Sequence, residues 1–423
     1  MRIGIISKEY FGFKSNTRGI PMNAHGGFGF LARKKAEALA AMGHEVHVFV
    51  PRFAYDGNNR EPLDTGLNGV NLHFFRTLHN IFAENTILQR GLRGLALLNL
   101  GRGPLDAFLR ENVDIFLSED PFQPSLEIVK RRLPHMGIFQ DPFDDIDYSL
   151  MREAEHDYLN GNLLEPRFVA EYTLRSMERE VSGTPYSRGR ILNRTLGAYA
   201  RSQSQHELFA EASFISEKLK AIFNLKAGPS VLRNPIDVPH TIPEKSDQPS
   251  VVWLARWDPQ KRPEVALKTA KEMPEIQFYF IGTASGHPVL QKRQTEIRSH
   301  YVEFENIHIL DFVSEEEKTR IMDRAWVLLN SSVREGLPIS FLEAGAHGCS
   351  IVSSVDPDNY ASRFGAFVRD GNFKDSISAL ISSEECFVLG RRAHEHMEKF
   401  HETGRVMEEH VKAMDRLLEQ IPQ

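Results

Sequence analysis

The sequence predicts an α/β protein of two domains, each a parallel β-sheet covered by helices. Short apolar runs alternate with amphipathic segments along the chain, and this alternation is typical of parallel sheets with helices on their faces. The pattern stops at the polar, proline-rich stretch 237–250 (DVPHTIPEKSDQPS) and then starts again. The length of 423 residues also suits two or three domains of about 100–200 residues each.

In the first half, a buried strand is expected at 2–7, followed by a long glycine-rich loop and a helix that reaches Met42. Gly43 then ends this helix, as glycine commonly does just past a helix C-terminus. Ser216 is expected to cap the last helix of this half. The remaining expected strands are 45–50, 70–75, 114–118, 136–140 and 212–216, and the remaining expected helices are 105–111, 126–132, 165–181 and 217–223.

The second half repeats the alternation after the polar stretch. A proline in the first turn supports a helix that begins at Pro263. The expected strands are 251–255, 276–281, 308–310, 327–330 and 351–353, and the expected helices are 263–271, 315–325 and 337–347. Ligands of such open parallel sheets bind at the carboxyl ends of the strands, so both halves are expected to present loops to one cleft.

Composition narrows the class of protein. Hydrophobic residues make up 41% and charged residues 26%, and the formal net charge is −6, so a whole-chain affinity for nucleic acid is not expected. Cys349 and Cys386 are the only cysteines, which argues against a disulfide framework and against a structural zinc site. Neither a signal peptide nor a run of about 20 apolar residues is present, and these features predict a cytoplasmic protein.

The strongest motif is Glu335-Gly-Leu-Pro-Ile-Ser-Phe-Leu-Glu343, which follows an expected strand and enters a helix. Backbone N–H groups at a helix start favour phosphate. Two carboxylates eight residues apart can accept hydrogen bonds from hydroxyls on different parts of an extended ligand. The alternative interpretation is an acidic helix cap at Glu335 and a solvated Glu343.

A second motif, Leu254-Ala-Arg-Trp-Asp-Pro-Gln-Lys-Arg-Pro263, follows the first strand of the second half. Arg256 and Lys261 supply two cations just after this strand. The planar guanidinium of Arg256 can bind two phosphate oxygens at once, and the ammonium of Lys261 acts as a point charge. Alone, a basic strand end is usually a solvated loop. In the same domain as the two-glutamate segment, it completes a site for a diphosphate and a sugar.

Together these motifs resemble the retaining glycosyltransferases of family four, which have the GT-B fold of two Rossmann-like domains facing a cleft. Gly26-Gly27-Phe28-Gly29 before a helix and Asn234-Pro-Ile-Asp237 between the domains add to the resemblance. It implies an acceptor-side domain over 1–235 and a donor-binding domain over 236–400. The C-terminal helix, about 400–423, is expected to pack back on the first domain.

The resemblance also implies roles for individual residues. Arg256 and Lys261 bind the donor diphosphate and stabilise the departing nucleotide, while Glu335 contacts the donor sugar; these three form the expected catalytic set. Glu343 binds the ribose hydroxyls. The backbone of the first domain approaches the donor closely at two glycines, for which a plain tight turn before a helix is the alternative interpretation. Backbone amides around Leu337 to Ser340 face the phosphates. The further donor-binding positions are Gly26, Gly27, Gly336, Leu337, Pro338, Ile339 and Ser340.

The acceptor side departs from the family pattern. Relatives often carry a histidine after a strand of the first domain, and Gln140 occupies that place here, so it can hydrogen-bond a sugar hydroxyl but cannot take a proton. Asp120, Asp141 and His25 are the other acceptor-side candidates, and strand-end caps and turn residues are the alternative interpretation. Asp145-Ile-Asp147 has the form of the metal-binding motif of a different glycosyltransferase fold; it is interpreted as a chance likeness or an acceptor-side feature, and no metal is expected.

The expected function is transfer of a sugar, with retention, from a UDP-, GDP- or ADP-sugar to a hydroxyl of a glycan, glycolipid or small molecule. One alternative is a nucleotide-sugar epimerase or hydrolase, and another is a non-catalytic nucleotide-sugar-binding relative. Two segments also suggest a peripheral contact with anionic lipid at the inner face of the membrane. These are the Leu- and Arg-containing stretch 87–101 and the arginines 175, 179, 188, 190, 194 and 201. For these arginines, a charged acceptor is another possible partner, and a solvated face is the alternative interpretation.

Overall fold

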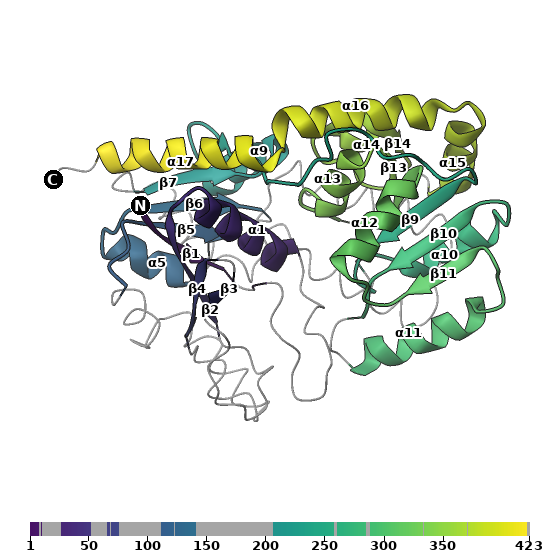
Figure 1. Ribbon diagram of the computed structural model, residues 1–423, viewed down its shortest axis with the longest axis horizontal. Coiled ribbons are helices and arrows are strands. Elements are labelled where there is room, and N and C mark those ends of the chain that lie inside the picture. Colours follow the sequence, from purple (N-terminus) through teal and green to yellow (C-terminus); the bar gives the residue numbers. More distant parts are fainter. Residues whose placement is uncertain are drawn as a thin grey trace. The chain divides into compact units, whose positions relative to one another are not determined.

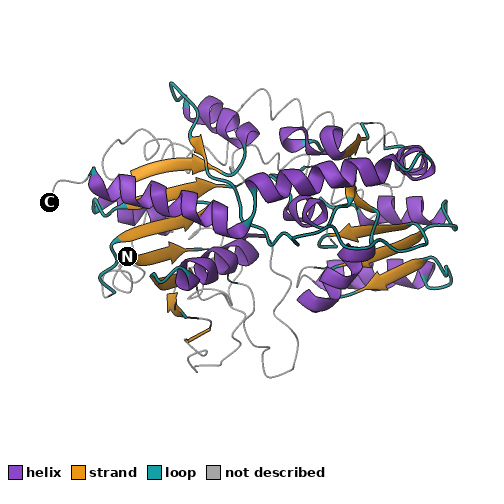
Figure 2. Cartoon of the chain, turned by 45° about the horizontal axis from the view of Figure 1, so that its top comes forward, coloured by secondary structure: helices purple, strands orange, loops and turns teal. Residues whose placement is uncertain are grey.

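The computed structural model divides into two compact units (Figure 1). Among the described residues, the first unit comprises 1–140, 206–235 and 404–420, and the second comprises 236–403. The structure describes residues 1–7, 10, 27–51, 66–67, 69–75, 111–121, 123–140, 206–257, 260–284, 288–332, 334–369 and 371–420. Figure 2 shows strands running side by side in each unit with helices packed over them.

The first unit is built on a sheet with the strand order β3-β4-β2-β1-β5-β6-β7-β8. All neighbouring strands are parallel except β3 and β4, which pair antiparallel. Strands β1, β5 and β6 are buried along almost their whole length, because a parallel sheet is covered on both faces. The strands are β1 (Arg2–Ile6), β2 (Glu45–Pro51), β3 (Gly66–Leu67), β4 (Val70–Phe75), β5 (Ile115–Glu119), β6 (His135–Phe139), β7 (His206–Ala210) and β8 (Ser230–Val231).

Helices α1 (Gly27–Ala41) and α17 (Thr403–Glu419) contribute to the main core of this unit. Ala36 of α1 and Met414 of α17 are both fully buried in one cluster with Ile3 of β1. The last helix therefore packs on the first unit although the chain reaches it from the second. On the other face of the sheet, Phe49 lies in a smaller cluster. The remaining helices are α5 (Gln123–Lys130) and α9 (Ser213–Phe223).

The second unit is a six-stranded parallel sheet with the order β11-β10-β9-β12-β13-β14. Its strands are β9 (Ser250–Leu254), β10 (Gln277–Ile281), β11 (Ile307–Leu310), β12 (Val327–Asn330), β13 (Ser350–Ser353) and β14 (Gly365–Phe367). Its helices are α10 (Pro263–Lys271), α11 (Pro288–Tyr301), α12 (Glu315–Arg324), α13 (Ile339–Ala346), α14 (Tyr360–Phe364), α15 (Phe373–Ser382) and α16 (Glu385–Phe400), with the 3-10 helix η3 at Pro357–Asn359. Because β9 and β12 are parallel neighbours, the loops that follow them leave the same edge of the sheet.

The predicted strand at 212–216 is wrong, because this segment begins helix α9 at Ser213. Ser216 is not a helix cap: it lies inside α9, and its Oγ donates to the carbonyl of Pro229 at 2.6 Å. A short apolar run such as this one does not distinguish a strand from a buried helical turn. The helix expected at 165–181 lies outside the described residues, as does the helix expected at 105–111 apart from Glu111.

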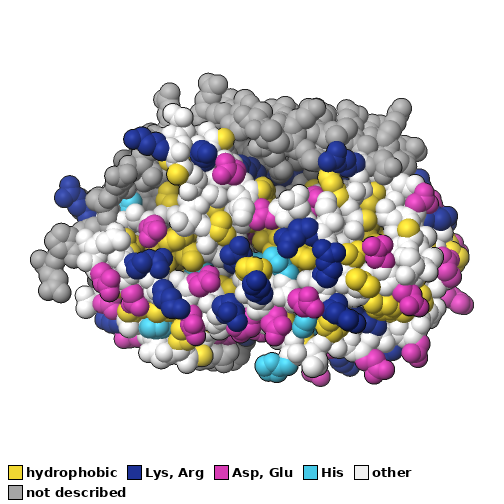
Figure 3. All heavy atoms as spheres, turned by 90° about the horizontal axis from the view of Figure 1, so that it is seen from above, with side chains coloured by type: hydrophobic (Ala, Val, Ile, Leu, Met, Phe, Trp, Pro, Cys, Tyr) yellow, Lys and Arg dark blue, Asp and Glu magenta, His cyan; other side chains and the backbone are white. Residues whose placement is uncertain are grey.

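Cationic and anionic side chains are interspersed on the surface in Figure 3, and on α17 Lys412 lies 3.7 Å from Glu408. Within the described part of the chain, none of the helices combines the length and the apolar character that crossing a bilayer requires. The two segments that suggested a lipid contact, 87–101 and 175–201, lie outside the described residues.

Candidate active site

The two motifs of the second half meet at the carboxyl edge of the second unit's sheet. Lys261 lies between β9 and α10, and Glu335 lies between β12 and α13. The Lys261 Nζ is 2.6 Å from each carboxylate oxygen of Glu335. Their side chains are 15% and 9% exposed, so water screens this ion pair less than it screens a surface pair. The structure thus brings together two charges that stand 74 positions apart in the sequence.

Polar residues at the end of β12 hold the Glu335 carboxylate in place. Ser332 Oγ donates to Glu335 Oε1 at 2.6 Å, and Asn330 Nδ2 approaches the same oxygen at 3.4 Å. Asn330 also accepts from the backbone N–H of Ser332 at 3.0 Å. Neither Asn330 nor Ser332 was predicted as a site residue from the sequence. Their signal was a polar run, Asn-Ser-Ser, directly after a buried parallel strand.

Arg262, next to Lys261 in the chain, has a different role. It is fully buried, and its backbone adopts the left-handed conformation at φ 48° as the N-cap of α10. Its Nε donates to the carbonyl of Ser331 at 2.6 Å, and its Nη2 donates to Ser354 Oγ at 3.1 Å. This guanidinium therefore ties the loop after β9 to the loops after β12 and β13, and it fixes the position from which Lys261 extends.

Arg256 follows β9 and its side chain is exposed. The backbone beside it is held by Gly282 at the end of β10. Gly282 has φ 137°, and a Cβ at this position would lie 1.9 Å from the carbonyl oxygen of Ala255. The glycine that ends this strand in the motif is therefore required for the close approach of two chain segments, and this approach sets the direction in which Arg256 leaves the sheet.

Glu343 is nine-tenths buried on α13 and has an ionic partner that the sequence did not reveal. Lys318 of α12 donates to Glu343 Oε1 at 2.6 Å and lies 2.8 Å from Glu315 Oε2. Burial alone lowers the pKa of Lys318, but the two carboxylates outweigh burial and raise this pKa above its usual value of 10.5. Glu343 is therefore not the solvated glutamate of the alternative interpretation, and its carboxylate is oriented by the neighbouring Lys318.

Helix α13 starts at Ile339, with Pro338 as its N-cap and no side-chain hydrogen bond to the first turn. Because proline has no N–H, any amide contact to an anion here comes from Leu337, Ile339 or Ser340 and not from Pro338. Gly336 is half-buried between Glu335 and this turn. The first turn of α13 thus follows shortly after Glu335 in the chain.

The first unit carries the acceptor-side candidates. Asp120 and Gln140 follow β5 and β6 and are both buried. Gln140 Nε2 donates to Glu119 Oε2, while Glu119 Oε1 accepts from Lys35 Nζ at 2.7 Å. Gln140 is therefore part of a buried hydrogen-bonded network at the sheet edge.

The remaining first-unit residues are placed only in part. Gly27 is the first residue of α1. The other positions named from the sequence, His25, Gly26, Asp141, Asp145 and Asp147, lie outside the described residues.

Comparison with known proteins identifies the class of the second unit. Residues 238–376 match the family model described as glycosyl transferases group 1. This segment contains Arg256, Lys261, Glu335 and Glu343, so the match confirms the resemblance inferred from these motifs and the prediction that the chain carries a glycosyltransferase domain. No curated protein sequence gives a significant match.

Solved structures show where the fold recurs. Sucrose-phosphate synthase from Thermosynechococcus elongatus superposes with a TM-score of 0.67 at 14% identity, covering 99% of this chain and all of that one. The Anabaena protein Alr3699/HepE in complex with UDP-glucose gives 0.60 at 10% identity, with 98% and 100% covered. WaaG, a glycosyltransferase involved in lipopolysaccharide biosynthesis, gives 0.56 at 15% identity, with 98% and 99% covered. These likenesses confirm the predicted fold class, two parallel-sheet domains of GT-B type.

Proposed function

We propose that this chain is a retaining glycosyltransferase whose nucleotide-diphosphate sugar binds at the second unit's sheet edge, beside the Lys261–Glu335 pair. The single observation that carries the proposal is this pair, mostly buried and located inside the segment that matches the glycosyltransferase family. The HepE complex with UDP-glucose supports a nucleotide sugar as the donor class. UDP-, GDP- and ADP-sugars are the candidates.

The reaction breaks the bond between the anomeric carbon and a phosphate oxygen. Negative charge then grows on the departing diphosphate, and fixed positive charge nearby stabilises that transition state. Lys261, held by both oxygens of Glu335, supplies such a positive charge beside the proposed diphosphate. Arg256 supplies a second, exposed guanidinium. Because these cations offset the developing charge, we expect no metal requirement at this site.

The two carboxylates act on the hydroxyl groups of the donor. Glu335, oriented by Ser332 and Lys261, accepts hydrogen bonds from the transferred sugar. Glu343, oriented by Lys318, accepts from the ribose. The acceptor is a hydroxyl compound, and its contacts are assigned to the first unit, where Asp120, Gln140, Asp141 and His25 remain candidates.

The test is a panel of UDP-, GDP- and ADP-sugars, with release of nucleoside diphosphate as the readout and water or simple sugars as acceptors. One nucleotide class should react, and proton NMR at early times should show a product with the anomeric configuration of the donor. An inverted product would contradict retention. Binding of the donor without any product, measured by thermal shift, would favour a non-catalytic relative. Release of an epimerised nucleotide sugar would favour the epimerase.

A further inference from the structure

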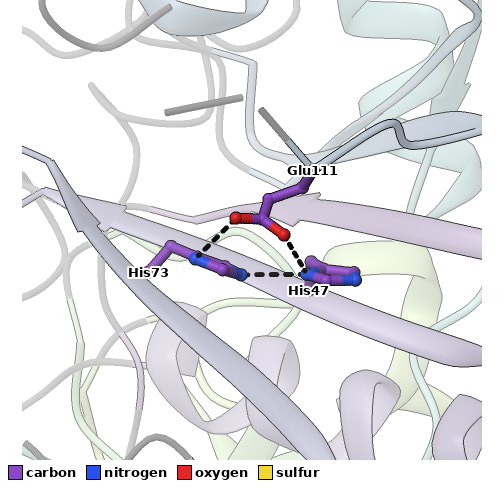
Figure 4. Close-up of side chains that lie close together, drawn as sticks. All are labelled: His47, His73 and Glu111. Carbon is purple, nitrogen blue, oxygen red and sulfur yellow. Dashed lines mark hydrogen bonds and ion pairs between the residues drawn. The ribbon is translucent and has the colours of Figure 1, made fainter. Parts of the chain in front are cut away.

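Two histidines and a glutamate of the first unit converge on one point (Figure 4). His47 comes from β2, His73 from β4 and Glu111 from the turn before β5. His47 Nδ1 lies 2.9 Å from His73 Nε2 and 3.7 Å from Glu111 Oε2. His73 Nδ1 lies 3.8 Å from Glu111 Oε1. One ligand atom from each residue can be chosen so that all these atoms lie within 4.8 Å of one another.

The surroundings orient both imidazoles. The His47 side chain is 4% exposed, and its ring stacks on His73 with centroids 5.1 Å apart. Phe49 is the cross-strand neighbour of His73 in the β2–β4 pairing. Its ring stacks on the His73 imidazole with centroids 4.9 Å apart. His73 and Glu111 are 25% and 30% exposed, so an ion can reach the cluster from solvent while the aromatic packing keeps the rings in place.

The hydrogen bonds of His47 favour a metal. Its Nε2 lies 3.0 Å from Glu45 Oε1, and a carboxylate only accepts, so the proton of the neutral ring sits on Nε2. Nδ1 then points a lone pair at the centre of the cluster. A metal-binding histidine commonly has this arrangement, with a carboxylate holding its other nitrogen.

The geometry of His73 points the same way. His73 Nδ1 faces Glu111 Oε1 at 3.8 Å, and with the proton of the neutral ring on this Nδ1, its Nε2 turns a lone pair toward His47 Nδ1 at 2.9 Å. Acceptor groups of two residues then face each other without a hydrogen atom between them. A cation removes this mismatch, since it accepts electron density from both residues at once.

We propose that His47, His73 and Glu111 form a site for a divalent transition metal of the zinc class. Imidazole nitrogens and a carboxylate suit this class and not the oxygen-only preference of magnesium or calcium. Ligands at about 2.0–2.2 Å from zinc lie at most ~4.2 Å apart, and the separations of His47 Nδ1 from His73 Nε2 and from Glu111 Oε2, 2.9 and 3.7 Å, meet this limit. The metal links β4 and the turn before β5 to β2. It therefore connects His73 and Glu111, the two residues that flank the segment 74–110.

The experiment is a titration of the full chain, treated with chelator and then dialysed, with ZnCl2 in competition with a chromophoric chelator. The wild-type chain should bind one equivalent, and CoCl2 should give the visible absorption of nitrogen- and oxygen-bound cobalt. His73→Gln and Glu111→Gln should each weaken affinity at least 10-fold. Glu45→Gln, which removes only the partner of His47 Nε2, should weaken it about 10–100-fold.

His300→Gln is the matched control, because His300 is exposed on α11 and outside the cluster; its affinity should equal that of the wild type. Circular dichroism without metal shows which variants fold, and Glu111→Gln, at a partly exposed and nearly isosteric position, is the variant least prone to misfolding. The proposal is overturned if folded Glu111→Gln and His73→Gln bind zinc as the wild type does. It is equally overturned if the wild-type chain binds no more zinc than its cluster variants.

Discussion

The amine of Lys261 lies 2.6 Å from both carboxylate oxygens of Glu335, and this contact joins the two motifs that indicate a glycosyltransferase. Each residue leaves a different loop, one after β9 and one after β12, and the parallel pairing of these strands puts the loops at one edge. The pair is mostly buried and is further held by Ser332. Its charges are therefore positioned before any donor arrives, which is the condition for electrostatic stabilisation of a transition state.

Replacing Glu343 by alanine is expected to weaken donor binding. A hydrogen bond to a charged group contributes about 1.5–3 kcal/mol, so the KM for the donor should rise roughly 10- to 100-fold. The value of kcat should change little, because the ribose is held equally in the ground state and the transition state. The measurement is the initial rate of nucleoside diphosphate release against donor concentration. Glu316→Ala, at an exposed acidic residue of α12, is the control, and an unchanged KM in Glu343→Ala would remove the assigned role.

Lys35 and Glu119 form an ion pair whose side chains are both fully buried. Lys35→Met is expected to reduce the free energy of unfolding by about 3–5 kcal/mol, because it leaves Glu119 as an uncompensated buried charge. Urea unfolding of the double variant Lys35→Met/Glu119→Leu should recover part of this loss.

The partly exposed Arg33–Glu37 pair, 32% and 28% accessible, supplies the control, and Arg33→Ala should cost no more than about 1 kcal/mol. Equal losses of unfolding free energy in Lys35→Met and Arg33→Ala would contradict the burial argument.

Gly282→Ala is expected to destabilise the second unit. The substitution puts a methyl group 1.9 Å from the Ala255 carbonyl oxygen at a backbone φ of 137°, and strain of this kind costs about 1–3 kcal/mol before any clash is relieved. Gly43→Ala separates the two effects, because Gly43 also has a positive φ, 88°, but nothing within 4 Å of the added atom. Calorimetry should show a larger fall in Tm for Gly282→Ala, and a similar fall in both variants would mean that the clash is relieved without cost.

Buried histidines predict a loss of stability in acid. Burial and the nearby charge of Lys35 lower the pKa of His410. The hydrogen bond to the Val406 carbonyl offsets part of this effect, and the pKa is about 3, compared with 6.5 for an ordinary histidine. Between these values the unfolded chain binds a proton that the folded chain does not, so the free energy of unfolding falls as the pH decreases through this window. One such group contributes about 1.4 kcal/mol per pH unit.

The measurement is urea unfolding between pH 6.5 and 5, where most carboxylates stay ionised. His410→Met should show a shallower dependence on pH than the wild type. His300→Gln, at an exposed position, should leave the dependence as it is. If His410→Met keeps the wild-type slope, the folded chain accommodates the charged ring and the assigned pKa is wrong.

Much of the fold was predictable because its signals are local. Helix α10 and strand β12 have the predicted bounds, Pro263–Lys271 and Val327–Asn330, since a proline in the first turn marks the helix and a bounded apolar run marks the strand. The error at 212–216 arose where local signals conflict: Ala-Ser-Phe-Ile-Ser suits a buried strand and a buried helical turn equally, and only packing beside β7 decides between them.

The site was predictable only where residues belong to a motif. Lys261 and Glu335 were identified in this way, but the partner of Glu343 was not, because Lys318 follows three glutamates and such a run usually indicates a solvated helix face. The buried link from Arg262 to Ser331 and Ser354 depends on how three strand ends meet. The cluster of His47, His73 and Glu111 was likewise not predictable, because the spacing of these residues in the sequence has no periodicity. They come together only through the order of the strands in the sheet.

The charge of Lys261 at the donor diphosphate is the central feature of the proposed site. The decisive measurement is kcat/KM for the donor identified in the panel, compared between the wild type, Lys261→Ala and Lys292→Ala, whose lysine is 80% exposed on α11. Loss of a group that stabilises the transition state should lower kcat/KM by about 10²–10³-fold in Lys261→Ala and leave Lys292→Ala unchanged. A folded Lys261→Ala enzyme with wild-type kcat/KM would contradict the proposed donor site.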